Sequence, residues 1–278
     1  MQKSILCSVS ALLFYINAAA QNNVLNGIYE PENKRSKVNY APLRQSDLMW
    51  SKRMWRVIDL REKMNHPLYF PVQPANGLKS LSQVVIDAVK NGYTYADGLT
   101  AYSANDDNFT VRLEKTEIDY MLLHYDTAYV QNANGIDEPV PYPVELESAS
   151  ILRYRVKEDW FFDRQRSVMD VRIIGISPVV ELYTPDGEYK GEKPLFWIYF
   201  NEARSVFANA YVFNRYSDSE RRTLEDVFWK RTFSSYIYKE SNVYDRKIME
   251  YKNGLDLLLE AKEIKDRVFR MEQDFWEM

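Results

Sequence analysis

The side chains that could take part in metal binding or catalysis are few in this sequence, and the two histidines come first. His66 and His124 are 58 residues apart. Neither belongs to a motif such as HExxH, which places two imidazoles and a carboxylate on one helix face. His66 stands in the proline-bounded turn HPLYFP, where we expect a structural hydrogen bond. The sequence predicts no metal site and no cofactor.

The carboxylates are no better arranged for acid–base chemistry. Asp106 is followed by Asp107, and Glu158 by Asp159; adjacent residues on a strand point to opposite faces of a sheet, so neither pair makes a catalytic dyad. We expect solvated charges at both places. The sequence also lacks GxSxG, Walker and GxGxxG motifs, which argues against a nucleophile elbow or a phosphate loop. We predict a protein that is not an enzyme and has no catalytic residues.

The first twenty residues have the composition of a secretory signal peptide. Lys3 gives a positive start, Ile5–Ile16 is mostly apolar, and Ala18–Ala20 precede Gln21, as at a signal-peptidase site. The only cysteine is Cys7, so the exported chain would contain no thiol for disulfides, metal binding or catalysis. No later stretch approaches the ~20 apolar residues of a membrane span. We expect an exported, soluble protein.

Charge and aromatic content limit the classes of partner that the chain could bind. The chain carries 36 Lys and Arg against 40 Asp and Glu, and interspersed signs of this kind do not favour binding to nucleic acid or to an anionic membrane. The 21 Tyr, 13 Phe and 6 Trp could build a glycan-binding platform. Most of them fall at positions periodic with a core, which favours burial. A periplasmic glycan- or peptidoglycan-binding protein is the alternative function.

The N-terminal part of the chain is expected to be an arm followed by helices. Residues 21–44 are rich in Asn, Pro and charge without an apolar period, which predicts an extended arm before a single α+β domain at residues 45–278. A helical subregion, residues 45–92, would open the domain with a helix from Asp47 to Met64. Its core face would carry Trp50, Met54, Val57, Ile58, Leu60 and Met64, with Leu48 and Trp55 almost opposite. Either another loop or helix of the same domain would cover these two residues, or they would form a second surface buried against another subunit.

A second helix is expected from Leu81 to Asn91, with Ser80 as its N-cap and Gly92 just past its end. Residues 117–123 fit either a short helix or a strand. Residues 131–143 have the composition of a loop.

From residue 150 to 278 we expect a β-rich and helical subregion. Alternating or continuous apolar runs predict four strands of a mostly antiparallel sheet, the last of them central: Ile151–Val156, Met169–Ile176, Val179–Tyr183 and Leu195–Phe200. Two helices follow, Glu202–Asn209 and Ser219–Phe233, the second opening at a capping box of Ser217 and Glu220. The predicted class is α+β, a mostly antiparallel sheet in the middle of the chain flanked by N-terminal and C-terminal amphipathic helices.

The last helix has the most regular pattern. A heptad seam with spacings of 3 and 4 is formed by Leu257, Ala261, Ile264, Val268, Met271 and Phe275. The seam fits docking on the protein's own core, which three heptads favour, or a coiled coil. Leu258, Phe269 and Trp276 widen the apolar stripe to one side, which would also allow contact with a neighbour.

Three long strings resemble the GldN family of gliding-motility proteins, called PorN in non-gliding relatives. They are DLMWSKRMWRVIDLREKMNHPLYFP, KEDWFFDRQRSVMDVRIIGISPV and FSSYIYKESNVYDRKIMEYKNG, the last followed by a helix ending in FRMEQDFWE. The resemblance covers about Asp47 to Met278. It extends to GldO, a close paralogue of GldN. It implies a periplasmic component of the type IX secretion machinery of Bacteroidota.

The resemblance also implies partners. Family members are thought to assemble with a lipoprotein, GldK or PorK, into a large ring beneath the outer membrane, and to meet the periplasmic part of the motor subunit GldM or PorM. A ring subunit meets its neighbours through two different faces. Our candidate interface residues are Leu48 and Trp55 on the first predicted helix, and Phe269 and Trp276 on the last.

Overall fold

The fold was analysed in a computed structural model. It describes residues 35–75, 77–92, 98–131, 137–184, 188–214 and 220–277, with the backbone alone for 124–131, 137–143 and 277. The predicted signal peptide and residues 21–34 of the predicted arm lie outside this range. Contacts group Ser36–Met278 into one unit, separate from Met1–Arg35.

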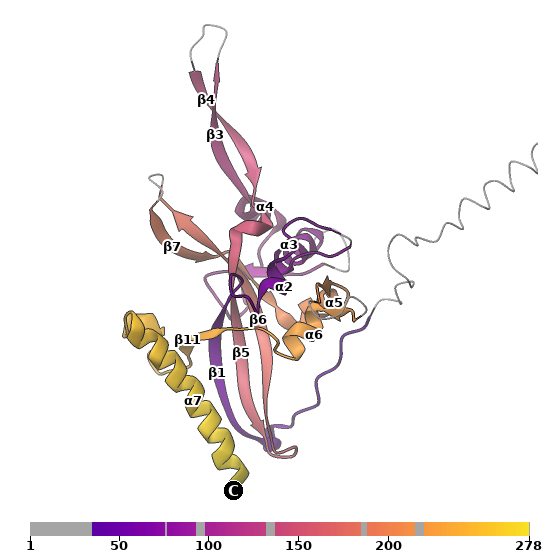
Figure 1. Cartoon of the computed structure of the whole chain (residues 1–278), viewed down its shortest axis with the longest axis vertical. Helices are drawn as coiled ribbons and strands as arrows, with labels where there is room; N and C mark the ends of the chain where they lie inside the picture. The colour runs from indigo at the N-terminus through magenta and orange to yellow at the C-terminus, as the bar shows by residue number, and fades with distance from the viewer. Residues whose placement is uncertain are drawn as a thin grey trace, which may run out of the picture. The chain divides into compact units, whose positions relative to one another are not determined.

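A seven-stranded antiparallel sheet organises the chain (Figure 1). Its order is β11-β1-β5-β6-β8-β2, with β7 beside the end of β6. The bounds are β1 Leu48–Asp59, β2 Ala101–Ser103, β5 Ile151–Asp163, β6 Val168–Tyr183, β7 Tyr189–Pro194, β8 Phe196–Tyr199 and β11 Tyr236–Glu240. The predicted antiparallel sheet and the α+β class are therefore confirmed, although the two strands predicted at Met169–Ile176 and Val179–Tyr183 are one continuous strand, β6.

The helix predicted from Asp47 to Met64 is wrong, because this segment is strand β1. It pairs with β5 over its whole length and with β11 over its second half, so Met54–Ile58 is buried without a break. A strand covered on both faces shows no period of two. Its apolar run then also fits a helical stripe, and only long-range pairing separates the two structures.

The helices lie outside the sheet. They are α2 His66–Tyr69, α3 Leu81–Asn91, α4 Lys115–Leu122, α5 Phe200–Phe207, α6 Leu224–Trp229 and α7 Leu255–Glu277, with single turns η2 Gln45–Asp47, η3 Ser148–Ser150 and η4 Ile248–Glu250. The helix predicted at Leu81–Asn91 is confirmed, and Ser80 and Gln83 form its capping box. Among the described residues, two further strand pairs lie outside this sheet: β9 Tyr211–Val212 with β10 Arg222–Thr223, of two residues each, and the longer pair of β3 Leu123–Gln131 with β4 Asp137–Glu145.

Two further predictions are corrected. Helix α6 begins at Leu224 instead of Ser219, because Thr223 and Asp226 form its capping box; Ser217 lies outside the described residues. The loop predicted at 131–143 contains most of β4, whose three prolines read as loop composition although each lies within the strand.

The sheet packs against two apolar clusters. The larger joins β1, β5, β6 and β8 to α3, α5 and α6 around Ile58, Tyr154 and Phe228. The smaller joins Met54 of β1 and Ile237 of β11 to α7 through Ala261, Ile264 and Val268. The heptad seam of the C-terminal helix thus docks on the protein's own sheet, the first of the two alternatives.

Residues 36–44 of the predicted arm lie against the rest of this unit. They have no regular secondary structure. The Arg172 guanidinium donates to the carbonyl oxygen of Ala41 at 2.6 Å, and Lys37 Nζ donates to that of Asn201 at 3.2 Å. Tyr40 stacks on Trp229 with 5.3 Å between ring centroids. This stretch is held by α5, α6 and β6.

Gly175 of β6 gives the first testable prediction. A Cβ at this position would overlap Cζ of Phe109, whose ring also packs edge-on to that of Tyr102, with 5.5 Å between the ring centroids. Gly175→Ala should lower the free energy of unfolding by about 1–3 kcal/mol, as overpacking does. Urea unfolding measures the loss. In a Phe109→Ala background the same change should cost much less; an equal cost in both backgrounds would show that the ring is not what excludes a side chain.

Asp59, at the end of β1, gives a prediction about pH. Hydrogen bonds from Arg61, at 2.6 and 2.9 Å, and from Arg153, at 3.2 Å, lower the pKa of Asp59 from 3.8 to about 2. A lowered pKa stabilises the fold at pH above about 4, and this stabilisation is lost as the pH falls toward 2. Asp59→Asn should therefore lower the melting temperature at pH 6, and the difference from the parent should vanish near pH 2. Asp266→Asn, an exposed change on α7, should show no such closing gap, and a constant deficit for Asp59→Asn would refute the titration argument.

Candidate interaction surfaces

Helix α7 carries a second apolar stripe that faces away from its docked seam. Leu255, Leu258 and Leu259 are more than half exposed, and so are Phe269 at 58% and Trp276 at 69%. At 100° per residue these positions fall within one sector, about 120° from the seam that contacts β1 and β11. We call this stripe the α7 surface. It contains two of the candidate interface residues, Phe269 and Trp276.

Leu48 and the C-terminal end of α7 come to the same end of the sheet. Leu48 begins β1 and is 36% exposed. Two residues further along β1, the ring centroid of Trp50 lies 6.5 Å from that of Phe275 of α7. The ring centroid of Phe162 of β5 lies 4.9 Å from that of the same phenylalanine. Leu48 therefore lies at the same end of the sheet as Phe275 on the docked seam of α7, whereas the sequence predicts two separate faces for Leu48 and for the C-terminal helix.

Trp55 lies elsewhere, on the wall of a polar pocket. It is only 6% exposed, because Lys239 and Lys157 approach its ring at 4.4 and 5.7 Å. Its indole N–H donates to Asp107 at 2.5 Å. Strand pairing and the 104–110 loop create this environment, which local periodicity could not predict.

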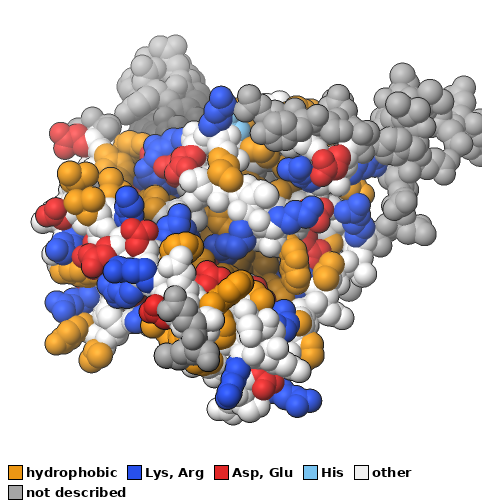
Figure 2. Space-filling view, turned by 60° about the horizontal axis from the view of Figure 1, so that its bottom comes forward, with side chains coloured by type: hydrophobic (Ala, Val, Ile, Leu, Met, Phe, Trp, Pro, Cys, Tyr) orange, Lys and Arg blue, Asp and Glu red, His pale blue; other side chains and the backbone are white. Residues whose placement is uncertain are grey.

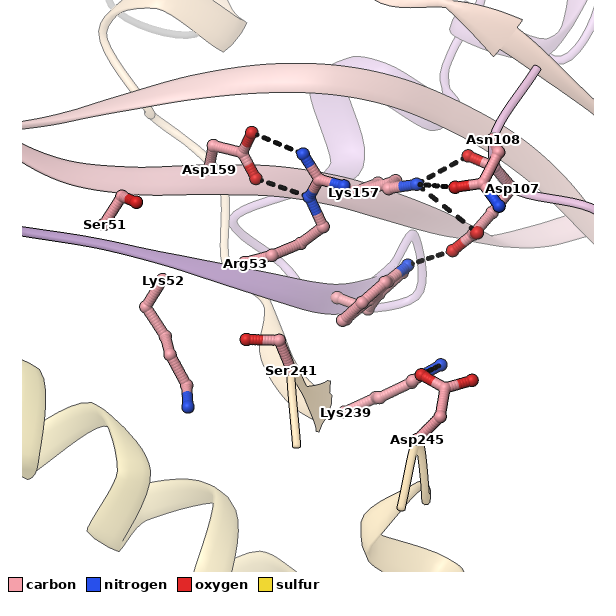
Figure 3. Close-up of a pocket in the computed structure, with 11 residues that line it drawn as sticks. Ser51, Lys52, Arg53, Asp107, Asn108, Lys157, Asp159, Lys239, Ser241 and Asp245 are labelled. Atoms are coloured by element: carbon pink, nitrogen blue, oxygen red, sulfur yellow. Dashed lines mark hydrogen bonds and ion pairs between the residues drawn. The ribbon is translucent and has the colours of Figure 1, made fainter. Parts of the chain in front are cut away.

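The pocket has a volume of about 540 Å³, and its charges are largely neutralised within it. Arg53 donates to both oxygens of Asp159 at 2.7 and 2.8 Å. Lys157 Nζ donates to the carbonyl oxygen of Asp107 at 2.6 Å, and lies 3.3 Å from its carboxylate, as Figure 3 shows.

These pairings decide what the pocket can do. Burial lowers the pKa of Lys157, but its ammonium group is held by acceptors of the loop and so offers no lone pair for nucleophilic attack. Lys239 is likewise paired with Asp245, at 2.6 Å. The arrangement fixes the 104–110 loop and the 241–246 loop to the sheet.

The adjacent carboxylates point to opposite faces of the sheet, as expected. Asp159 faces the pocket. Glu158 does not carry the solvated charge that we expected, since it is fully buried and binds Arg231 at 3.0 Å and the indole N–H of Trp160 at 3.0 Å. Glu158 thus links the two apolar clusters: Trp160 packs against the smaller one, and Arg231 lies over the ring of Phe233 in the larger one.

A loop after β11 was missed by the sequence analysis. Val243 is 97% exposed and Tyr244 73%. The Asn242 carboxamide oxygen accepts hydrogen bonds from the backbone N–H groups of Tyr244 and Arg246 at 3.1 and 3.0 Å. Asn within a short polar run is the local signal for such a turn; the exposure of the tip has no local signal.

The described residues also bear on metal binding and on membrane insertion. His66 lies 3.3 Å from the carbonyl oxygen of Arg61, and the side chain of His124 is outside the description. Within the described ranges, no three His, Cys, Asp or Glu side chains could together hold a metal ion, and no helix has both the length and the apolarity to cross a membrane. On the face seen in Figure 2, basic and acidic side chains are interspersed with apolar ones.

The described residues form an α+β protein with a large antiparallel sheet, and its C-terminal helix docks on that sheet while keeping large apolar side chains exposed. Residues 43–277 match the family described as gliding motility associated protein GldN, and the chain belongs to this family. This is a family of structural components of gliding motility and type IX secretion, and it is not known as an enzyme family. A search of curated proteins found no match.

Proposed function

We propose that the chain is a structural periplasmic subunit of the type IX secretion machinery. In this proposal it assembles with an outer-membrane lipoprotein of the GldK or PorK kind into a ring on the inner side of the outer membrane. The periplasmic part of a motor subunit of the GldM or PorM kind contacts that ring.

The α7 surface is the observation that carries the proposal. A helix whose seam is already buried gains nothing for its own fold from a second apolar stripe, whereas aromatic residues at an interface supply much of the binding energy. A group of exposed apolar side chains on one element often marks a contact site, whereas single exposed apolar residues scattered over a surface are normal. We assign Phe269, Trp276 and Leu48 to one face of the subunit, and keep Trp55 as a wall of the polar pocket.

Deletion of the gene tests the proposal at the level of function. A strain without the chain should fail to secrete type IX cargo, and the parental chain supplied in trans should restore secretion. Normal cargo secretion in the deletion strain, with the lipoprotein still present, would contradict a structural role in the apparatus.

The polar pocket keeps the glycan-binding alternative open. Trp55 stands there with Asp107, Asn108 and Asp159, a combination of aromatic ring, carboxylate and amide found in carbohydrate sites. Because lysines approach its ring and Asp107 takes its N–H, little of the indole is free to stack on a sugar. Sedimentation with isolated peptidoglycan sacculi decides between the two: the ring proposal predicts no co-sedimentation, and glycan binding predicts co-sedimentation that Trp55→Phe preserves and Asp107→Ala weakens.

A further inference from the structure

Strands β3 and β4 form a hairpin with an unusual distribution of proline. Nine residue pairs join them without a break, from Leu123 with Glu145 to Gln131 with Asp137. Three of the nine residues of β4 are proline, and they alternate: Pro139, Pro141 and Pro143. In Figure 1 the two strands run side by side, and no other described strand accompanies them.

The alternation fixes which way the prolines face. In an antiparallel pair, the N–H and C=O of one residue both point toward the partner strand and those of the next both point away. A proline nitrogen has no hydrogen to donate, so pairing that continues past all three prolines requires their nitrogens to lie on the outer edge of β4. That edge offers only carbonyl groups there, and a further strand cannot extend the sheet beyond β4.

The same register leaves the outer edge of β3 open. The residues opposite the three prolines are Tyr129, Thr127 and Tyr125. Their N–H and C=O groups therefore also point away from the hairpin. Strand β3 reads LHYDTAYVQ, with no proline, glycine or lysine to block pairing. Among the described strands, only β4 pairs with it.

This asymmetry has a physical cost unless something covers β3. A free, proline-less edge is a template for pairing with another chain, and a two-stranded hairpin alone is marginally stable in water. Blocking one edge while leaving the other open is what a hairpin needs if it is to accept one strand and no more.

We propose that β3 pairs antiparallel with β3 of a second copy of this chain. The two-fold axis would pass beside Thr127, so that Thr127 lies opposite Thr127 of the second copy and Tyr125 lies opposite its Tyr129. All three outward-facing residues then make hydrogen-bonded pairs, and Asp126 lies opposite Ala128, so no like charges face each other. The resulting sheet, in the order β4-β3-β3-β4, has proline-blocked edges on both sides, and pairing stops at two copies.

A second copy fits this edge better than an unrelated strand, because the copy brings its own proline-blocked β4, which closes the sheet without further chains, and because the register about Thr127 places Asp126 opposite an uncharged residue. The inference is independent of the proposed function, since a pair that closes at two copies does not make a ring.

Single engineered cysteines test the register. Cys7 lies in the predicted signal peptide, so one introduced cysteine would be the only thiol of the exported chain. Opposed Cα atoms of a hydrogen-bonded pair lie about 5.5 Å apart, which a disulfide spans. Thr127→Cys should give a disulfide-linked dimer under mild oxidation. Asp126→Cys and Ala128→Cys should each link poorly alone, and should link when the two variants are produced together.

Val140→Cys on β4 is the matched control, because β4 would lie about 10 Å from the nearest strand of the second copy. We expect at least tenfold less linked dimer from it than from Thr127→Cys. Equal yields from the two, or a Thr127→Cys chain that links only to another protein, would overturn the proposal.

Proline itself supplies the second test. Thr127→Pro removes an N–H from the open edge and leaves the hairpin's own hydrogen bonds intact, as Pro141 does across from it. Thr127→Val, which keeps the N–H, is its control. In sedimentation equilibrium of the full exported chain, Thr127→Pro should dimerise at least tenfold more weakly than Thr127→Val, with matching circular dichroism. Equal dimerisation of the two folded variants would contradict the proposal.

Discussion

Replacing Phe269 and Trp276 together with glutamate is expected to abolish assembly while leaving the fold intact. Both side chains are more than half exposed, so the change costs the isolated subunit little. Each buried aromatic anchor of an interface typically contributes about 2 kcal/mol or more, and two carboxylates would also have to be desolvated. We predict loss of co-purification with the lipoprotein and loss of cargo secretion, with an unchanged melting temperature.

The control for this variant adds the same charge at other exposed apolar positions. Val111→Glu with Tyr120→Glu changes residues that are 56% and 76% exposed and lie outside α7. It should assemble and secrete normally. If the α7 double variant also secretes normally, the α7 surface is not an interface. If instead its melting temperature falls as for Ile264→Glu, which breaks the docked seam, the α7 surface supports the fold and our assignment is wrong.

Arg204→Ala, on α5, should strongly lower the free energy of unfolding. The side chain is 1% exposed; its Nη2 and Nε donate to Glu225 at 2.8 and 3.1 Å, and Nη2 also donates to the carbonyl oxygen of Val38. Its guanidinium lies 4.2 Å from the ring centroid of Tyr40 and 5.0 Å from that of Trp229. Removing one member of a buried ion pair leaves the other unpaired, at a cost of about 3–5 kcal/mol.

A second variant separates the contribution of the ion pair to stability from the attachment of residues 36–44. Arg204→Met with Glu225→Leu removes both charges, and apolar replacement of a buried pair is often neutral, so most of the stability should return. The hydrogen bond to Val38 is still absent from this variant. Trypsin should therefore cut after Lys37 faster than in the parent, although global unfolding is nearly restored. If the double variant were as unstable as Arg204→Ala, the loss of stability would come from the packing around Tyr40 and not from the unpaired charge of Glu225.

What the sequence could predict depended on how local the signal was. Helix α3 was placed to the residue, because Ser80 and Gln83 cap it within the helix itself. The seam of α7 was also correct, since a long amphipathic period has few other interpretations. Strand β1 was missed because β5 and β11, which lie far along the chain, bury both its faces.

The candidate interface residues divide in the same way, into those placed by a local signal and those placed by distant segments of the chain. Phe269 and Trp276 could be placed off the seam by projection on a helix that does form. Trp55 was projected on a helix that does not form. Its environment is made by Lys157, Lys239 and Asp107, which come from three distant segments.

The measurement that tests the central claim most directly is co-purification of the exported chain with its co-expressed lipoprotein partner, followed by size-exclusion chromatography and negative-stain electron microscopy. We predict a large co-eluting complex that appears as rings or arcs. A chain that elutes apart from the lipoprotein, in an assembly no larger than two copies whether or not the lipoprotein is present, would contradict the claim that it is a structural subunit of the secretion ring.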